Sequence, residues 1–309
     1  MIEKNNVPLQ EVSWIKSDEA LKDANKSCAA HLYYPETITE LLELCRDFYR
    51  SGESFDLIAY ASNTLLLPSY HPRHLVCTKR LKGMTEDEEH LICECGMAVR
   101  ELALYCVEKG YEGFEGLIDL PGAVAAAIYG NAGCYGCRVA THLSHIELLG
   151  EDGEVCMVTP DELAFSFRSS ALKRGELKGV VLRAVFKKVE GDKAVLAQRA
   201  EAAHRERKAT QPSAANNLGS TMVGCTQRTA WGHVIIPLAR TLARFTRNRR
   251  QTEVAVILLL TGYRRLRPYL FRMNRYMFLD ARAHQLFPAY LDLMRKLYKD
   301  PRLEIEIRK

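Results

Sequence analysis

Apolar and polar positions in the first 190 residues follow a helical period in some segments and a strand period in others. In residues 36–50, apolar side chains recur at spacings of three and four and so share one helix face: Ile38, Leu41, Leu42, Cys45 and Phe48. Thr37 and Glu40 have the spacing of a capping box at the helix start. The pattern therefore predicts an amphipathic helix.

Strand patterns precede and follow a polar turn in the next segment. Residues 56–67 predict a buried strand, a tight turn at Ser62-Asn63 and a second apolar run. Residues 90–95 predict another strand, and residues 97–109 predict a helix that ends at Gly110.

A hairpin and a further strand complete this part of the chain. Apolar runs on both sides of residues 151–153, Glu-Asp-Gly, predict a hairpin, and residues 179–189 predict a strand. Because helices and strands mix without a regular βαβ repeat, the pattern indicates an α+β fold.

The last third of the chain has a less regular pattern. Residues 190–212 are charged and helix-prone and predict a connector, and residues 278–298 predict a strand followed by a helix. Within residues 231–276, apolar positions recur at helical spacing: Val234, Ile235, Leu238, Leu242 and Phe245. Core packing is the favoured interpretation of this row, and contact with a membrane surface is the alternative.

Length and composition limit the class of protein. A chain of 309 residues with 47% hydrophobic and 26% charged residues is typical of a soluble globular protein with more than one core. The longest apolar run, Val254 to Leu260, is too short to cross a bilayer, so no membrane span is expected. Composition excludes a disordered chain but indicates no function.

Charge and cysteines add two expectations. From Arg240 onward there are 17 Lys/Arg and 6 Asp/Glu, a charge of +11, which leaves −6 for residues 1–239. This basic part should attract anions, yet no nucleic-acid-binding motif accompanies its arginines, and no nucleic-acid partner is expected. The ten cysteines are spread from Cys28 to Cys225 behind a start without an apolar signal core, which favours the reducing cytoplasm.

Residues 120–136, LPGAVAAAIYGNAGCYG, concentrate small side chains in one place. Such a run serves either tight packing between elements or close approach of the backbone to a flat or phosphorylated ligand. Packing is the usual reason for a Gly/Ala run. Here Asn131 stands between Gly130 and Gly133 and is followed by Tyr135-Gly136, a mixture of polar, aromatic and bare backbone groups that suits a cofactor wall.

This run resembles the FAD-binding wall of the UDP-N-acetylenolpyruvoylglucosamine reductases, the MurB family. Ser62-Asn63 is similar to the family's Gly-Ser-Asn turn. Residues 167–173, FRSSALK, resemble its Tyr-Arg-x-Ser-x-x-Lys box, and residues 217–220, NLGS, resemble its Gly-Ser segment. Residues 303–308, LEIEIR, resemble its Leu-Glu-Pro-Glu-Val-Arg element. The similarity is extensive over residues 30–190. Beyond them it is limited to two short segments.

The resemblance implies a fold, a cofactor and a substrate. The fold is a two-lobed FAD-binding domain of the MurB/vanillyl-alcohol-oxidase type, in residues 1–75 and 76–190, with a smaller C-terminal α+β substrate domain in residues 191–309. FAD contacts are implied for Ser62, Asn63, Pro121, Gly122, Ala123, Asn131, Ala132, Gly133, Tyr135 and Gly136. Substrate contacts are implied for Ser170, Lys173 and Gly219. NADPH is the implied electron donor and a nucleotide-sugar the implied partner.

Three residues are the implied catalytic groups: Arg168, Ser220 and Glu306. In the reaction that the resemblance implies, NADPH reduces FAD, and an enolpyruvyl ether of a UDP-sugar then receives the hydride. Arg168 would stabilise the negative charge that develops at the carboxylate end. Glu306 would assist if burial raised its pKa, and Ser220 would protonate the neighbouring carbon.

Several positions depart from the family pattern. Alanine replaces the usual glycine at Ala59, Ala61, Ala125 and Ala126, Tyr60 replaces a small residue, and Phe167 replaces a tyrosine. After Ser220 the family continues Phe-Lys-Asn-Pro, whereas this chain reads TMVG, and residues 231–276 lack the Ser-x-x-His-Ala-Asn signature. Two alternatives therefore stay open: a MurB-like flavoprotein with a different substrate, and a non-catalytic descendant that binds anions through its arginine-rich part.

Cysteine and histidine pairs suggest other chemistry only weakly. Cys134 and Cys137 have the spacing of a redox dithiol but follow a Gly/Ala turn instead of opening a helix. Cys93 and Cys95 lie in a predicted strand and are expected in the core. His142 and His145 lack an evident third ligand, so no metal site is predicted.

Overall fold

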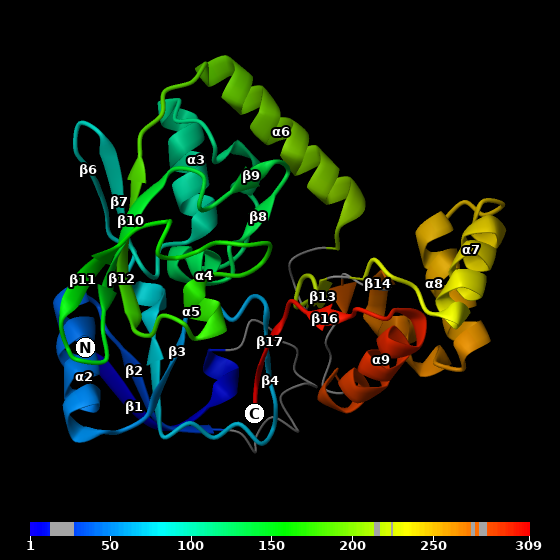
Figure 1. Ribbon diagram of the computed structural model, residues 1–309, viewed down its shortest axis with the longest axis horizontal. Helices are drawn as coiled ribbons and strands as arrows, with labels where there is room; N and C mark the ends of the chain where they lie inside the picture. The colour runs from blue at the N-terminus through cyan, green and yellow to red at the C-terminus, as the bar shows by residue number, and fades with distance from the viewer. Residues whose placement is uncertain (13–27, 213–216, 224, 273–275, 278–282) are drawn as a thin grey trace. The chain divides into compact units, whose positions relative to one another are not determined.

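The computed structural model describes residues 1–12, 28–212, 217–223, 225–272, 276–277 and 283–309. Contacts divide the chain into two compact units (Figure 1). The first unit contains residues 1–7, 29–60 and 72–211, and the second contains residues 8–28, 61–71 and 212–309. Each unit is thus assembled from segments far apart in sequence. The division at residues 75 and 190, which assigns binding roles to consecutive parts, stays a prediction.

One sheet of the first unit has four strands, in the order β1 (Ile2–Pro8), β2 (Cys28–Tyr34), β5 (His74–Cys77) and β3 (Phe55–Ile58). The central strand β5 runs parallel to β2 and to β3. Helix α2 (Ile38–Ser51) connects β2 to β3, which confirms the predicted amphipathic helix. The Thr37 hydroxyl accepts the Glu40 N–H at 3.2 Å, while the Glu40 carboxylate accepts the Glu36 N–H, so half of the predicted capping box forms.

A second sheet of the first unit has five strands, in the order β11 (Val155–Val158), β10 (Leu143–Leu149), β12 (Val180–Lys187), β7 (His90–Glu94) and β6 (Met84–Glu86). Neighbouring strands are antiparallel, and β10 and β11 form the predicted hairpin. The strands predicted at 90–95 and 179–189 are confirmed. Helix α3 (Val99–Lys109) ends at Gly110, which adopts φ +92° as a C-terminal cap.

Helices cover the sheets and complete the core of the first unit. Helices α3 and α6 (Lys193–Thr210) lie side by side (Figure 1), and α4 (Val124–Tyr129) contacts β12. Cys45 and Phe48 of α2 share a cluster with Val180 and Leu182 of β12, so α2 packs against both sheets. Cys93 and Cys95 are buried as predicted. The shorter elements are η2 (Thr78–Arg80), η3 (Glu115–Leu117), β8 (Gly133–Cys134), β9 (Cys137–Arg138) and α5 (Ala171–Arg174).

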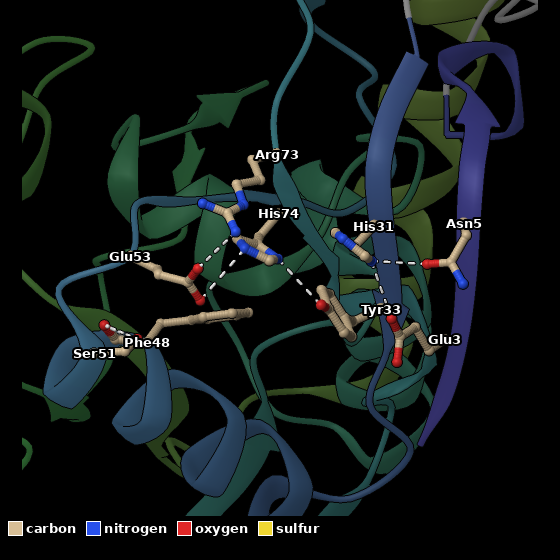
Figure 2. A network of polar contacts seen from close by, with 9 residues as sticks. All are labelled: Glu3, Asn5, His31, Tyr33, Phe48, Ser51, Glu53, Arg73 and His74. Carbon is tan, nitrogen blue, oxygen red and sulfur yellow. Dashed lines mark hydrogen bonds and ion pairs between the residues drawn. The ribbon is translucent and has the colours of Figure 1, made fainter.

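A polar network extends across the first sheet to α2 (Figure 2). Buried His74 lies with Nδ1 3.1 Å from the Tyr33 hydroxyl and Nε2 3.5 Å from a Glu53 carboxylate oxygen. Its ring stacks on His31 at 5.1 Å between centroids. Burial lowers the pKa of His74 although Glu53 opposes that shift, so the environment favours the neutral ring.

Three helices and three strand pairs make up the described part of the second unit. The helices are α7 (Ala230–Ala243), α8 (Arg249–Thr261) and α9 (Ala283–Leu297), with the short turns η1 (Leu9–Glu11) and η4 (Arg264–Tyr269). The pairs are β13 (Met222–Val223) with β16 (Arg302–Leu303), β14 (Leu270–Arg272) with β15 (Tyr276–Met277), and β4 (Thr64–Leu66) with β17 (Glu306–Arg308). Helix α9 confirms the helix predicted in 278–298, whereas residues 278–282, where its preceding strand was expected, lie outside the described residues.

The predicted core row on α7 is wrong for four of its five members. Ile235 is buried, but Val234, Leu238, Leu242 and Phe245 are exposed. The buried face instead combines Ile235 and Ile236 with small residues: Gly232, Ala239 and Ala243. Small side chains allow closer approach of neighbouring elements, so packing here selected size above hydrophobicity. Among the helices in the described ranges, none has the length and apolar character that a membrane crossing requires.

Candidate functional site

The small-residue run begins with a turn that is fixed by the start of α3. Gly122 adopts φ +116°, which favours glycine. Its carbonyl accepts the Val99 N–H at 3.0 Å, and the Val124 N–H donates to the Met97 carbonyl at 2.8 Å. Pro121 and Ala123 therefore belong to a backbone segment that two hydrogen bonds hold in place.

The run ends in a tight hairpin formed by β8 and β9. Tyr135 and Gly136 both have positive φ, 49° and 84°, as a two-residue type I′ turn requires. The hairpin packs on Gly116, where an added Cβ would lie 2.7 Å from the Cys134 carbonyl oxygen. The Tyr135 hydroxyl accepts a hydrogen bond from the Gln211 amide at 3.0 Å. Part of the small-residue pattern is therefore explained by packing.

Asn131 has a feature that packing does not explain. It is buried with φ +43°, and its Nδ2 donates to the Ser166 carbonyl at 2.7 Å. Its Oδ1 is buried without a hydrogen-bond partner among the described residues. An unsatisfied buried acceptor costs roughly 1–3 kcal/mol, so this oxygen is suited to a donor from a bound molecule. Ala132 and Gly133 follow it directly and are half-buried.

Arg168 lies beside the same run. Ser166 and Ser169 exchange backbone hydrogen bonds at 3.0 and 3.2 Å, which places Arg168 in a tight turn with φ +57°. Its Nη2 donates to the Gly133 carbonyl at 2.9 Å. The structure thus brings together three predicted residues of the first unit, Asn131, Gly133 and Arg168.

Ser170 and Lys173 contact neighbouring residues of α4 and α5. The buried Ser170 hydroxyl donates to the Tyr129 carbonyl at 2.8 Å and accepts the Lys173 N–H at 3.2 Å, so it caps α5 and ties it to α4. The Lys173 ammonium lies 6.0 Å from the centroid of the Tyr129 ring. Substrate binding by these two residues stays a prediction.

In the second unit, three predicted segments meet at Asn63. Its Nδ2 donates to the Leu218 carbonyl and, at 3.0 Å, to the Ser220 carbonyl. Its own carbonyl accepts the Glu306 N–H at 3.0 Å, where β17 runs parallel to β4. Residues 62–63, 219–220 and 306 therefore form one cluster although they are far apart in sequence.

Two left-handed residues shape this cluster. Gly219 adopts φ +68°, and its N–H donates to the Asn217 side-chain oxygen at 2.8 Å. Ala61 precedes half-buried Ser62 and adopts φ +51°. The family pattern usually has glycine at this position. Sequence reasoning predicted Asn63 as a cofactor contact, and it missed that the Asn63 amide binds two carbonyl groups of the NLGS segment.

The cysteine pair in the hairpin is held in a form unsuited to redox chemistry. The Cys134 thiol donates to the Gly116 carbonyl at 3.1 Å, and the Cys137 sulfur accepts the Gly116 N–H at 3.3 Å. Burial raises the pKa of Cys134 to about 11, which disfavours the reactive thiolate. Across the described residues, including His142 and His145, no group of three His, Cys, Asp or Glu side chains could hold a metal ion.

Comparisons with known proteins show what this chain is similar to. No family model matches the chain. The UDP-N-acetylenolpyruvoylglucosamine reductase of Caldicellulosiruptor saccharolyticus is 27% identical over 186 residues, which make up 60% of this chain and 59% of that protein. The same enzyme of Bacillus pumilus is 33% identical over 132 residues, 43% of each chain. This chain therefore spans 43% to 59% of the length of these two relatives.

A solved structure agrees over the full length. The crystal structure of UDP-N-acetylenolpyruvylglucosamine reductase (MurB) from Thermus caldophilus aligns with all of both chains, with a TM-score of 0.67 and 20% sequence identity. The fold is thus the α+β fold of that MurB structure. Together with the sequence matches, it confirms the predicted resemblance to the MurB family, at modest identity.

Proposed function

We propose that this protein is an FAD-dependent oxidoreductase that uses NADPH to reduce an enolpyruvyl UDP-sugar, UDP-N-acetylenolpyruvoylglucosamine, to UDP-N-acetylmuramate. The names of its relatives support this substrate class. The single observation that carries the cofactor assignment is the buried Oδ1 of Asn131 in the small-residue run, which has no hydrogen-bond partner in the part of the chain that the structure describes. We further propose a role in peptidoglycan precursor synthesis in the cytoplasm.

The residues of the first unit fit FAD. Flavin and ribityl groups carry N–H and O–H donors that can satisfy the Asn131 oxygen, and the turn at Gly122 offers backbone without side-chain bulk. When bound, FAD supplies the hydride chemistry that amino-acid side chains cannot provide. Pro121, Ala123, Ala132, Tyr135 and Gly136 would complete the wall. The extra methyl groups at Ala125 and Ala126 lie on α4, half-buried and exposed, and so leave the turn itself unobstructed.

The proposed catalytic groups act on the substrate. Arg168 would bind the carboxylate of the enolpyruvyl group and stabilise the negative charge that develops there, because its guanidinium is permanently charged. Ser220 would donate its hydroxyl proton to the carbon next to that carboxylate. Glu306 would polarise the carboxylate itself. Arg168 lies in the first unit, and Ser220 and Glu306 lie in the second.

Anaerobic spectroscopy tests this function. The purified protein should be yellow, bleach on addition of NADPH and regain colour with UDP-N-acetylenolpyruvoylglucosamine. Arg168→Ala and Glu306→Gln should be reduced by NADPH normally and reoxidised at least about 100-fold more slowly, the loss typical of a group that stabilises transition-state charge.

Matched controls are Arg50→Ala and Glu43→Gln, which remove exposed charges on α2 and should reoxidise at the wild-type rate. Normal reoxidation of the Arg168 and Glu306 variants would refute the site assignment. Normal reduction with no reoxidation of the wild type by this substrate would instead favour a different acceptor. Colourless protein that takes up no FAD would favour the anion-binding alternative.

A further inference from the structure

Helix α7 exposes a continuous row of large apolar side chains. Trp231, Val234, Leu238 and Leu242 are spaced by three and four residues, so these four lie along one side of the helix, and Phe245 follows in the turn after its end. Their exposed fractions are 60%, 64%, 45%, 46% and 85%, in chain order. We call these five residues the apolar stripe. Contiguous exposed apolar side chains of this size usually mark an interaction surface.

Packing prevents α7 from turning the stripe inward. The buried face contains Gly232, where an added Cβ would lie 2.1 Å from the Leu297 carbonyl oxygen of α9. Ala239 and Ala243 are buried on the same face. A rotation that brought Trp231 or Leu238 to this position would place a large side chain where the backbone of α9 leaves room only for hydrogen. The exposure of the stripe is therefore built into the packing of the second unit.

Many cationic side chains lie near the stripe in the sequence. Residues 228–269 contain nine arginines and one acidic residue, Glu253, which pairs with Arg240 at 3.0 Å. Arg244 and Arg247 flank Phe245, and Arg249 and Arg250 begin α8 directly afterwards, all of them exposed. The surface therefore combines insertable apolar groups with a strong excess of positive charge.

We propose that the apolar stripe of α7 docks on the surface of an anionic lipid bilayer. Tryptophan, phenylalanine and leucine side chains enter the boundary between headgroups and acyl chains, while guanidinium groups bind lipid phosphates. A second copy of the chain would bring two arginine-rich surfaces together, which like-charge repulsion disfavours. The inference is independent of the proposed catalytic function, since the stripe contains none of the residues assigned to it.

Vesicle binding tests this proposal. The chain has two tryptophans, so the variant Trp14→Phe leaves Trp231 as the single source of tryptophan fluorescence. Its emission should shift to shorter wavelength with vesicles of equal parts phosphatidylglycerol and phosphatidylcholine, and not with pure phosphatidylcholine. In the native chain, Val234→Ser together with Phe245→Ser should weaken sedimentation with anionic vesicles by at least about tenfold, because both lose apolar contact with the bilayer.

The matched control is Met157→Ser, which removes a 70% exposed apolar side chain from β11 and should bind like the wild type. Circular dichroism checks folding, and Phe245→Ser alone serves if the double variant unfolds. Absence of binding to anionic vesicles at low salt would overturn the proposal, as would binding that the serine substitutions leave unchanged. Self-association abolished by Trp231→Ser would also overturn it, because a second copy would then be the occupant, and so would binding to single-stranded RNA in place of vesicles.

Discussion

Asn131 combines a backbone role with a chemical one. Asparagine tolerates the left-handed conformation that the turn requires, and its amide fixes the Ser166 turn while its oxygen stays available. Sequence reasoning could single out Asn131, because it interrupts a Gly/Ala run. It could not predict the opposite roles of the two amide atoms, since these depend on the Ser166 carbonyl, 35 residues away.

His74 gives a pH-dependent prediction at the same scale. The folded-state pKa of His74 lies below its ordinary value of 6.5. Between these two pKa values, the unfolded chain therefore binds the proton more readily than the folded chain does. Its contribution to stability is therefore complete above pH 6.5 and is lost as the pH falls toward the folded-state pKa. Urea unfolding across this pH range should show that the free energy of unfolding falls more steeply with falling pH in the wild type than in His74→Gln. Parallel curves for the two proteins would contradict this account.

At the scale of elements, local signals predicted helices and hairpins well, and tertiary packing decided the rest. The α2 cap, the Gly110 stop and the hairpin at 151–153 depend on neighbouring residues and could be predicted from sequence. The buried face of α7 could not, because the preference for small residues there depends on how closely α9 approaches the helix at Gly232. Hydrophobic periodicity shows that a helix has two faces but does not measure the space beside each.

Ser170 tests the role of a cap at this scale. Ser170→Ala removes the acceptor for the Lys173 N–H and the donor to the Tyr129 carbonyl, so it should lower the free energy of unfolding by about 2 kcal/mol. Chemical denaturation measures this change, with the exposed Ser51→Ala as the control. A loss of substrate affinity with unchanged stability would instead support the binding role that the family resemblance implies.

At the scale of the whole molecule, the chain is interleaved. Strand β4, from residues 64–66, pairs with β17 of the second unit, and Leu65 belongs to the core of that unit. The motifs at 62–63, 217–220 and 303–308 could be recognised from sequence only as separate islands. Their meeting at Asn63 depends on strand pairing across more than half the chain, which no local pattern specifies.

This interleaving predicts that the C-terminal segment does not fold alone. A fragment of residues 212–309 lacks the strand partner of β17 and the Leu65 side chain, so it should show little cooperative unfolding by circular dichroism. A peptide of residues 61–71 should restore part of the transition, whereas the same peptide with Leu65→Asp should not. Cooperative unfolding of the fragment without the peptide would contradict the observed pairing.

The most direct test of the central claim, that the first unit holds FAD against its small-residue run, is a titration of the flavin-free protein with FAD. The wild type should quench flavin fluorescence at a single saturable site. Asn131→Ala should bind about tenfold more weakly, the equivalent of one lost hydrogen bond, with Asn5→Ala on β1 as the control. Equal affinity of Asn131→Ala and the wild type, or no saturable binding by either, would contradict the account.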